Sequence, residues 1–232
     1  MARRPAQKSA RPAAGRAPST PTGDRDKIVA AFLELLAEKQ FEEIGFADIA
    51  GRAGVSLAQL RGDFASTLAI LAAHIKATDR AVLAADFSDM QEEPARERLF
   101  DVLMRRLETL GPHREAVRSL LRSARRNPPL ALALNGLATR SQQWMLSAAG
   151  IEASGPRGLL RAQGLAVLFA SVLRTWVHDD DPGLARTMAA LDRALARGQR
   201  VAGFLDDLCR IPARLCPRRR RRHDDSEESA AA

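Results

Sequence analysis

The chain has 232 residues, of which 46% are hydrophobic, and it carries a formal net charge of +8. It contains no tyrosine and only 4% aromatic residues, which argues against binding of single-stranded nucleic acid by base stacking. No apolar stretch reaches the roughly 18 residues that a membrane-spanning helix needs. Cys209 and Cys216 are too few for a disulfide framework. We therefore expect a cytoplasmic protein, and the alanine- and arginine-rich composition suggests a bacterial source.

The positive charge is concentrated at the two ends of the sequence. Residues 1–23 hold five basic and no acidic side chains, and their prolines and alanines predict a disordered basic arm. Residues 213–232 contribute +2, which leaves only +1 for residues 24–212, and within these the segment 24–75 carries −3. Two interpretations of the arm stay open: salt-sensitive tracking of DNA phosphates, or a solubilising tail.

Apolar residues recur at helical spacing between proline and glycine boundaries, and no segment shows sustained alternation with a period of two. The sequence therefore predicts an all-α fold of about nine helices. We expect four regions: the arm over 1–23, a helix-turn-helix domain over 24–71, a helical ligand-binding and dimerisation domain over 72–208, and a basic then acidic tail over 209–232. The expected helices span approximately residues 24–39, 47–53, 57–62, 66–86, 95–110, 114–126, 129–149, 157–178 and 182–208.

Residues 45–64 have the pattern of two short helices joined by a tight turn. Ala53 is small enough for two helices to approach closely, and Gly54 suits a backbone with positive φ. Val55 is apolar, and Ser56 is placed to cap the second helix with its hydroxyl. The apolar positions that return to a core are Ile49, Ala50, Leu60 and Phe64.

The segment from Asp24 to Leu71 resembles the N-terminal domain of the TetR family of bacterial transcriptional regulators. The matching residues are Ile49-Ala50, Ala53-Gly54-Val55-Ser56, Leu60, Phe64, Ser66 and Ile70. The resemblance implies a homodimer whose second motif helix enters the major groove of double-stranded DNA. The residues expected to contact DNA are Gly45, Arg52, Ser56, Leu57, Ala58, Gln59, Arg61 and Thr67.

The sequence departs from the family pattern where that family touches DNA. The family usually has threonine at the Gly45 position, often lysine at Leu57, usually tyrosine at Arg61 and usually lysine at Thr67. These family residues mostly reach phosphates, which position a protein on the duplex. Arg61 retains the means to reach a phosphate or a guanine edge, and Thr67 retains one hydroxyl donor.

The expected helix over 157–178 is apolar nearly all round, which predicts burial on several sides. Together with the helix over 182–208 it is expected to form half of a four-helix dimer interface. A second resemblance covers Thr175–Arg197, which is similar to the end of the TetR-like lipid-binding protein that assists coenzyme Q biosynthesis. That resemblance implies the same fold with an isoprenoid lipid as the ligand.

A hydrophobic small-molecule effector is expected to bind within the second domain. The candidate contacts are Phe100, Leu103, Met104, Leu107, Trp144, Phe169 and Leu173. For any single one of them, packing in the core is the simpler explanation. Few polar groups would orient such a ligand, unless Arg140, Gln142, Gln143, Arg174 or His178 points inward.

No catalytic motif is present, so we expect neither an enzyme nor a cofactor. His178 precedes three aspartates, Asp179–Asp181, which are better explained by a solvated turn and a helix cap than by a metal site. Apolar residues between Phe204 and Leu215, followed by Arg218–Arg222, give 201–222 the composition of a peripheral contact with an anionic membrane. DNA phosphates, or docking of the apolar residues onto the body, explain that segment as well.

The sequence thus leaves two hypotheses. The first is a homodimeric repressor that binds DNA and responds to a hydrophobic small molecule. The alternative is a TetR-fold accessory protein of coenzyme Q biosynthesis that binds isoprenoid lipid at a membrane surface.

Overall fold

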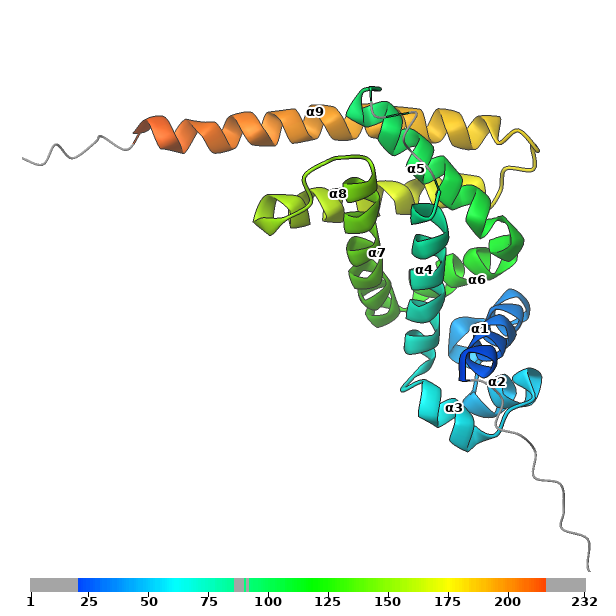
Figure 1. Cartoon of the computed structure of the whole chain (residues 1–232). Coiled ribbons are helices and arrows are strands. Elements are labelled where there is room, and N and C mark those ends of the chain that lie inside the picture. The colour runs from blue at the N-terminus through cyan, green and yellow to red at the C-terminus, as the bar shows by residue number, and fades with distance from the viewer. Residues whose placement is uncertain (1–20, 86–89, 91, 216–232) are drawn as a thin grey trace, which may run out of the picture. The chain divides into compact units, whose positions relative to one another are not determined.

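A computed structural model describes residues 21–85, 90 and 92–215, and within these the side chains between residues 23 and 200. All regular elements within these residues are helical, as expected (Figure 1). They are α1 (Pro21–Glu38), η1 (Phe41–Glu43), α2 (Phe46–Ala53), α3 (Leu57–Asp63), α4 (Thr67–Leu83), α5 (Ala95–Leu110), η3 (Gly111–His113), α6 (Arg114–Arg126), α7 (Pro128–Ala148), α8 (Gly155–Trp176) and α9 (Ala185–Leu215).

Most helix ends lie within three residues of the predicted ones, and α9 differs most. The helix begins at Ala185 rather than at 182, because the Asp181 carboxylate accepts hydrogen bonds from the backbone N–H groups of Gly183 and Ala185 at 3.1 and 3.0 Å. It then continues through Pro212 to Leu215 instead of ending at 208. Pro212 lies in the last turn of this helix.

The described chain divides into two compact units, and the division falls within α4. The N-terminal unit comprises residues 21–77 and 113–127, and the C-terminal unit comprises 78–112 and 128–215. The helix-turn-helix domain predicted over 24–71 lies in the N-terminal unit. That unit also contains α6, which was predicted to belong to the second domain, over 72–208.

Helix α1 is the centre of the N-terminal unit, since α2, α3 and α6 all contact it. Its predicted apolar stripe is buried, with Ile28, Phe32 and Leu36 at most 1% exposed. Two serines of α6 explain why that helix joins this unit. The Ser119 hydroxyl donates to the Lys39 carbonyl at 2.7 Å, and the Ser123 hydroxyl accepts from the Phe41 N–H at 3.1 Å.

The C-terminal unit is built from packed helix pairs: α7 with α8, α8 with α9, and α5 with both α7 and α9. The turn between α8 and α9 is held by Asp179, which is buried and accepts from the N–H and the hydroxyl of Thr187 at 2.8 and 2.6 Å. These bonds lower the pKa of the Asp179 carboxyl. Asp179 is thus a structural residue, rather than part of the fully solvated turn that the sequence suggested.

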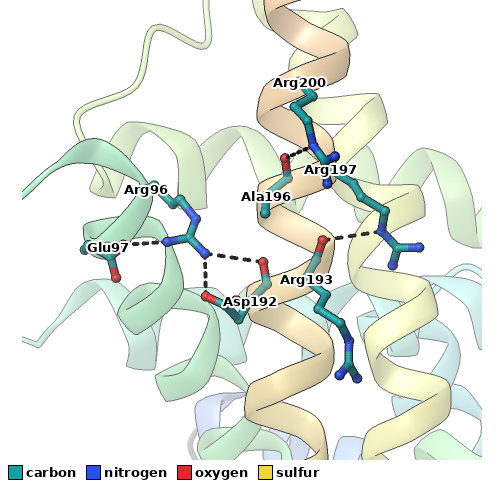
Figure 2. A network of polar contacts seen from close by, with 7 residues as sticks. All are labelled: Arg96, Glu97, Asp192, Arg193, Ala196, Arg197 and Arg200. Carbon is teal, nitrogen blue, oxygen red and sulfur yellow. Dashed lines mark hydrogen bonds and ion pairs between the residues drawn. The ribbon is translucent and has the colours of Figure 1, made fainter.

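Helices α5 and α9 are joined by an ion pair between Arg96 and Asp192 (Figure 2). Arg96 also pairs with Glu97 at 2.7 Å on its own helix. Further along α9 the arginines lie against their own helix, and the Arg197 side chain donates to the Arg193 carbonyl at 3.3 Å. Because both Arg96 and Asp192 are partly exposed, this pair orients the helices more than it stabilises them.

No helix in the part of the chain described by the structure combines the length and apolar character needed to cross a membrane. Among the same residues, no three or more His, Cys, Asp or Glu side chains are grouped so that they could hold a metal ion.

Candidate DNA-binding site and apolar interior

The turn between α2 and α3 has the backbone geometry that the Gly54 position predicted. Gly54 has φ 67° and ψ 30°, in the left-handed region. Its N–H donates to the Gly51 carbonyl at 3.3 Å, and the Val55 N–H donates to the Ala50 carbonyl at 3.0 Å. This pair of bonds is a Schellman motif, which ends α2 and redirects the chain into α3.

Ser56 caps α3 through a reciprocal pair of hydrogen bonds. Its hydroxyl accepts from the Gln59 N–H at 3.1 Å, and the Gln59 side chain accepts from the Ser56 N–H at 2.8 Å. The predicted capping role of Ser56 is confirmed. Gln59 was expected only to contact DNA, whereas in the structure its side chain completes the capping box.

One face of α3 is buried and the other faces solvent. Leu60 is 2% exposed, whereas Leu57 is 55% exposed, and Ala58 and Arg61 are also exposed. Arg61 makes no hydrogen bond or ion pair with any described residue, and it is the one basic residue of α3. The solvent face of this helix therefore presents one cation that no carboxylate of the described chain neutralises.

The end of α3 is joined to α1 by Arg25, which was not among the predicted site residues. Arg25 donates to the Asp63 carbonyl at 3.1 Å, and its guanidinium lies 4.3 Å from the centre of the Phe64 ring. A cation over an aromatic face is a favourable contact. No sequence pattern identifies it, because the two residues are far apart in the chain.

Arg52 is engaged within the unit. Its guanidinium donates to both carboxylate oxygens of Glu38 at 2.9 Å and reaches Glu34 at 3.4 Å, so α2 is paired with α1. The paired guanidinium lowers the pKa of the Glu38 carboxyl. Arg52 can contact a phosphate only if it gives up its bidentate pair with Glu38. Arg61 has no such pair to break among the described residues.

The other two predicted contacts lie at the starts of helices. Gly45 precedes α2 with φ −86°, and a Cβ built there meets only the Asp48 carboxylate at 3.7 Å. The backbone therefore does not require glycine at this position. Thr67 is the first residue of α4, where the preceding Ser66 hydroxyl accepts the Ala69 N–H at 3.1 Å. Remaining N–H groups of that first turn favour an anion.

The placement of α6 changes the charge of the N-terminal unit. Counted over 21–77 and 113–127, the unit has eleven lysines and arginines and nine aspartates and glutamates. The α6 arginines reverse the net negative charge of the segment 24–75. Arg122, Arg125 and Arg126 are exposed, and α6 lies on the other side of α1 from α2 and α3 (Figure 1).

The predicted effector contacts separate into three groups within the C-terminal unit. Leu103 and Leu107 of α5 and Phe169 of α8 are buried. Phe100, Met104 and Leu173 are half-buried. Trp144 is 60% exposed on α7 and does not lie with the buried set. Of the polar candidates, Gln142 is buried at 1% exposure, Gln143 is half-buried, and Arg140, Arg174 and His178 are exposed.

The residues that carry the second resemblance have packing roles. Trp176, Thr187 and Leu191 are fully buried, and Asp192 forms the ion pair with Arg96. Helix packing thus accounts for these residue types without a lipid. Of the segment 201–222, the backbone up to 215 belongs to α9, and its side chains and residues 216–222 lie outside the described part.

Helix α8 is less buried than its composition predicted. Phe169, Val172 and Trp176 line its buried face, but Leu159, Leu160 and Val167 are 53%, 57% and 60% exposed. The expectation of burial on several sides is therefore wrong for the single chain. An apolar face remains open to solvent on this helix.

Two alanine variants test whether the positive φ of Gly54 requires glycine. Gly54→Ala forces a Cβ into the left-handed region and should lower the stability of the N-terminal unit by about 1 kcal/mol, although nothing lies within 4 Å of the added atom. Gly51→Ala, in the interior of α2, should raise it by about 0.5–1 kcal/mol. Hydrogen exchange of the α2 and α3 amides measures both, and equal signs would contradict the assignment.

No protein-family model matches the chain, and no curated protein matches it either. Solved structures with a similar fold do exist. A TetR transcriptional regulator from Nitrosomonas europaea superposes with a TM-score of 0.57 at 22% identity, covering 75% of this chain and 97% of the other. One from Rhodococcus sp. RHA1 gives 0.55 at 21% identity, with 76% and 96% covered.

A TetR-family regulator from Streptomyces coelicolor gives a TM-score of 0.51 at 18% identity, covering 83% of this chain and 87% of that one. At such identities the similarity establishes the arrangement of the helices. In all three comparisons most of both chains is included, so the similarity is not confined to the helix-turn-helix. This chain therefore has the fold of the TetR-family transcriptional regulators.

Proposed function

We propose that the protein is a homodimeric DNA-binding repressor that is released by a hydrophobic small molecule. The observation that carries the proposal is the α2–α3 unit, with its Schellman turn, its Ser56 cap and the unpaired cation of Arg61 on the solvent face of α3. A helix that is capped, anchored at both ends and open on one face is suited to the major groove.

The contacts differ in the role we assign to them. Arg61, with Leu57 and Ala58 beside it, reads base edges, because an arginine pairs well with guanine and an apolar side chain packs on a thymine methyl. The start of α4 at Thr67 and the basic arm 1–23 bind phosphates, which position the protein without reading sequence. The net positive charge of the N-terminal unit supports the approach to DNA.

Selection of bound genomic fragments, followed by retesting against scrambled competitor DNA, tests this function. We expect Arg61→Ala to weaken binding of the selected site by roughly 1–3 kcal/mol and to reduce discrimination against scrambled DNA. Arg122→Ala on α6 is the matched control, since it removes the same charge from the same unit on the other side of α1. An equal loss in both variants, or an unchanged Arg61→Ala affinity, would show that α3 does not read the site.

The homodimer is supported by the open face of α8. Leu160, Gly164, Val167 and Ser171 follow one another at helical spacing, and all four are exposed in the single chain. The small Gly164 and Ser171 allow another helix to approach closely, while the two larger residues supply apolar area. A two-fold pairing through α8 and α9 would also present two α3 helices to successive half-sites of a palindrome.

The effector site is proposed to lie in the apolar interior of the C-terminal unit. Leu103, Leu107 and Phe169 provide its buried surface. Effector binding there favours one of two conformations and lowers the affinity for DNA by a coupling free energy. Addition of the effector should therefore release the selected fragment without unfolding the protein.

A further inference from the structure

A buried polar cluster lies among the apolar residues of the C-terminal unit. Arg106 of α5 forms an ion pair with Asp79 of α4, and the Ser141 hydroxyl of α7 donates to the same Asp79 oxygen at 2.8 Å. Arg106, Asp79 and Ser141 are 5%, 7% and 3% exposed. The Arg106 guanidinium also lies 5.7 Å from the centre of the Phe169 ring, one of the expected effector contacts.

Two buried polar atoms of the C-terminal unit have no hydrogen-bond partner among the described residues: Nε of Arg106, which belongs to this cluster, and Oε1 of Gln142 on α7. Gln142 is 1% exposed and follows Ser141 directly on α7. Contacts link Arg106 through Asp79 to Ser141, and Gln142 is the next residue of α7. Buried polar atoms are nearly always hydrogen-bonded, and an unpaired one is costly. One donor and one acceptor are thus available in a region that is otherwise apolar.

We infer that this cluster binds the polar head of an amphiphilic effector whose head group is uncharged and both accepts and donates hydrogen bonds, as a hydroxyl or a primary amide does. Such a head accepts from the Arg106 Nε–H and donates to the Gln142 oxygen. The apolar body of the effector then packs on Leu103 and Leu107, which are buried on α5 with Arg106, and on the buried Phe169 of α8.

Charge decides between this head group and an ionic one. The charge of Arg106 is already balanced by Asp79, so a carboxylate or phosphate head would bring an uncompensated negative charge into a buried region. A quaternary ammonium would be placed beside the Arg106 guanidinium and has no hydrogen to donate to Gln142. A neutral head group meets both unpaired atoms and leaves the ion pair intact.

The inference rests on the proposed function, because it specifies the effector of the same interior, and the two are tested separately. The purified full-length protein is titrated, without DNA, with a medium-chain 1-alkanol, the alkanoate and the alkyltrimethylammonium of equal chain length, below their micellar concentrations. We expect the alkanol to bind about ten-fold or more tightly than either ion, as measured by calorimetry and by the shift of Tm.

Gln142→Leu is the decisive variant, and Gln143→Leu, the same change at the neighbouring half-buried position of α7, is its control. Gln142→Leu should weaken alkanol binding about ten-fold and leave alkanoate binding unchanged, whereas the control should alter neither. Because Gln142→Leu removes an unpaired buried acceptor, the Tm of the unliganded protein should not fall, which separates lost recognition from misfolding.

Three results overturn the inference: tightest binding of the alkanoate, binding of none of the probes, or equal alkanol binding by Gln142→Leu and the wild-type chain. If the protein selects a DNA site but gives any of these three results, the proposed repressor function stands and the head-group assignment is wrong. If the protein binds the alkanol selectively but selects no DNA site, the head-group assignment stands and the proposed repressor function is wrong.

Discussion

Replacing Arg106 with methionine is expected to lower the free energy of unfolding of the C-terminal unit by about 3–5 kcal/mol. The substitution keeps the length of the side chain and removes its charge, so the Asp79 carboxylate remains buried with only Ser141 donating to it. Urea unfolding followed by tryptophan fluorescence measures the effect, because Trp144 and Trp176 both lie in that unit and are the only tryptophans of the chain.

Two further variants separate charge from packing. Arg105→Met changes the preceding, exposed residue of α5 and should alter the stability by less than about 0.5 kcal/mol. In the double variant Asp79→Leu with Arg106→Met both charges are absent, and most of the lost stability should return, because an apolar pair avoids the desolvation cost. A double variant as unstable as Arg106→Met alone would mean that side-chain shape, and not the unpaired carboxylate, determines the loss.

Val167→Glu is expected to convert the proposed dimer into a monomer. The side chain is 60% exposed on the open face of α8 in the single chain, so a glutamate there is tolerated by the isolated fold. In a two-fold interface the same glutamate is desolvated and lies close to its symmetry-related copy, which should raise the Kd of the dimer about a hundred-fold, or about 3 kcal/mol.

Analytical ultracentrifugation over a range of concentrations measures this change, with circular dichroism to confirm that the helices are retained. Leu132→Glu on α7 is the matched control, because Leu132 is an apolar residue with 74% exposure outside the α8 face. We expect this control to remain dimeric. If Leu132→Glu dissociates and Val167→Glu does not, the interface lies on α7 instead. A protein that is monomeric before any substitution would contradict the homodimer.

Features set by residues close to one another in the chain could be predicted from the sequence. The Gly54 turn and the Ser56 cap involve residues within a few positions of one another, and the sequence predicted the helix boundaries that they set. The start of α9, which the Asp181 carboxylate caps, lies three residues after the predicted one. Helical periodicity likewise placed Ile28, Phe32 and Leu36 on one buried stripe of α1. Local backbone preferences and apolar spacing are sufficient for such features.

Contacts between segments far apart in the chain could not be predicted from the sequence. Nothing in the composition of α6 indicates that Ser119 and Ser123 bind the backbone at Lys39 and Phe41, which brings the α6 arginines into the helix-turn-helix unit. Arg52 was expected to face DNA, yet only the packing of α2 against α1 shows that it is paired with Glu38.

Arg106 is the clearest case of what only the tertiary structure decided. In the sequence it stands beside Arg105 and looks like one of many surface arginines, while Gln142 was one of five polar residues with no reason to be preferred. The packing of α4, α5 and α7 buries both and brings Asp79 to Arg106. The sequence by itself determined the helices, most of their ends and the helix-turn-helix, because these depend on neighbours along the chain. Which charges are paired, which polar atoms are buried and which apolar face stays open depend on contacts between segments far apart, and those exist only in the folded chain.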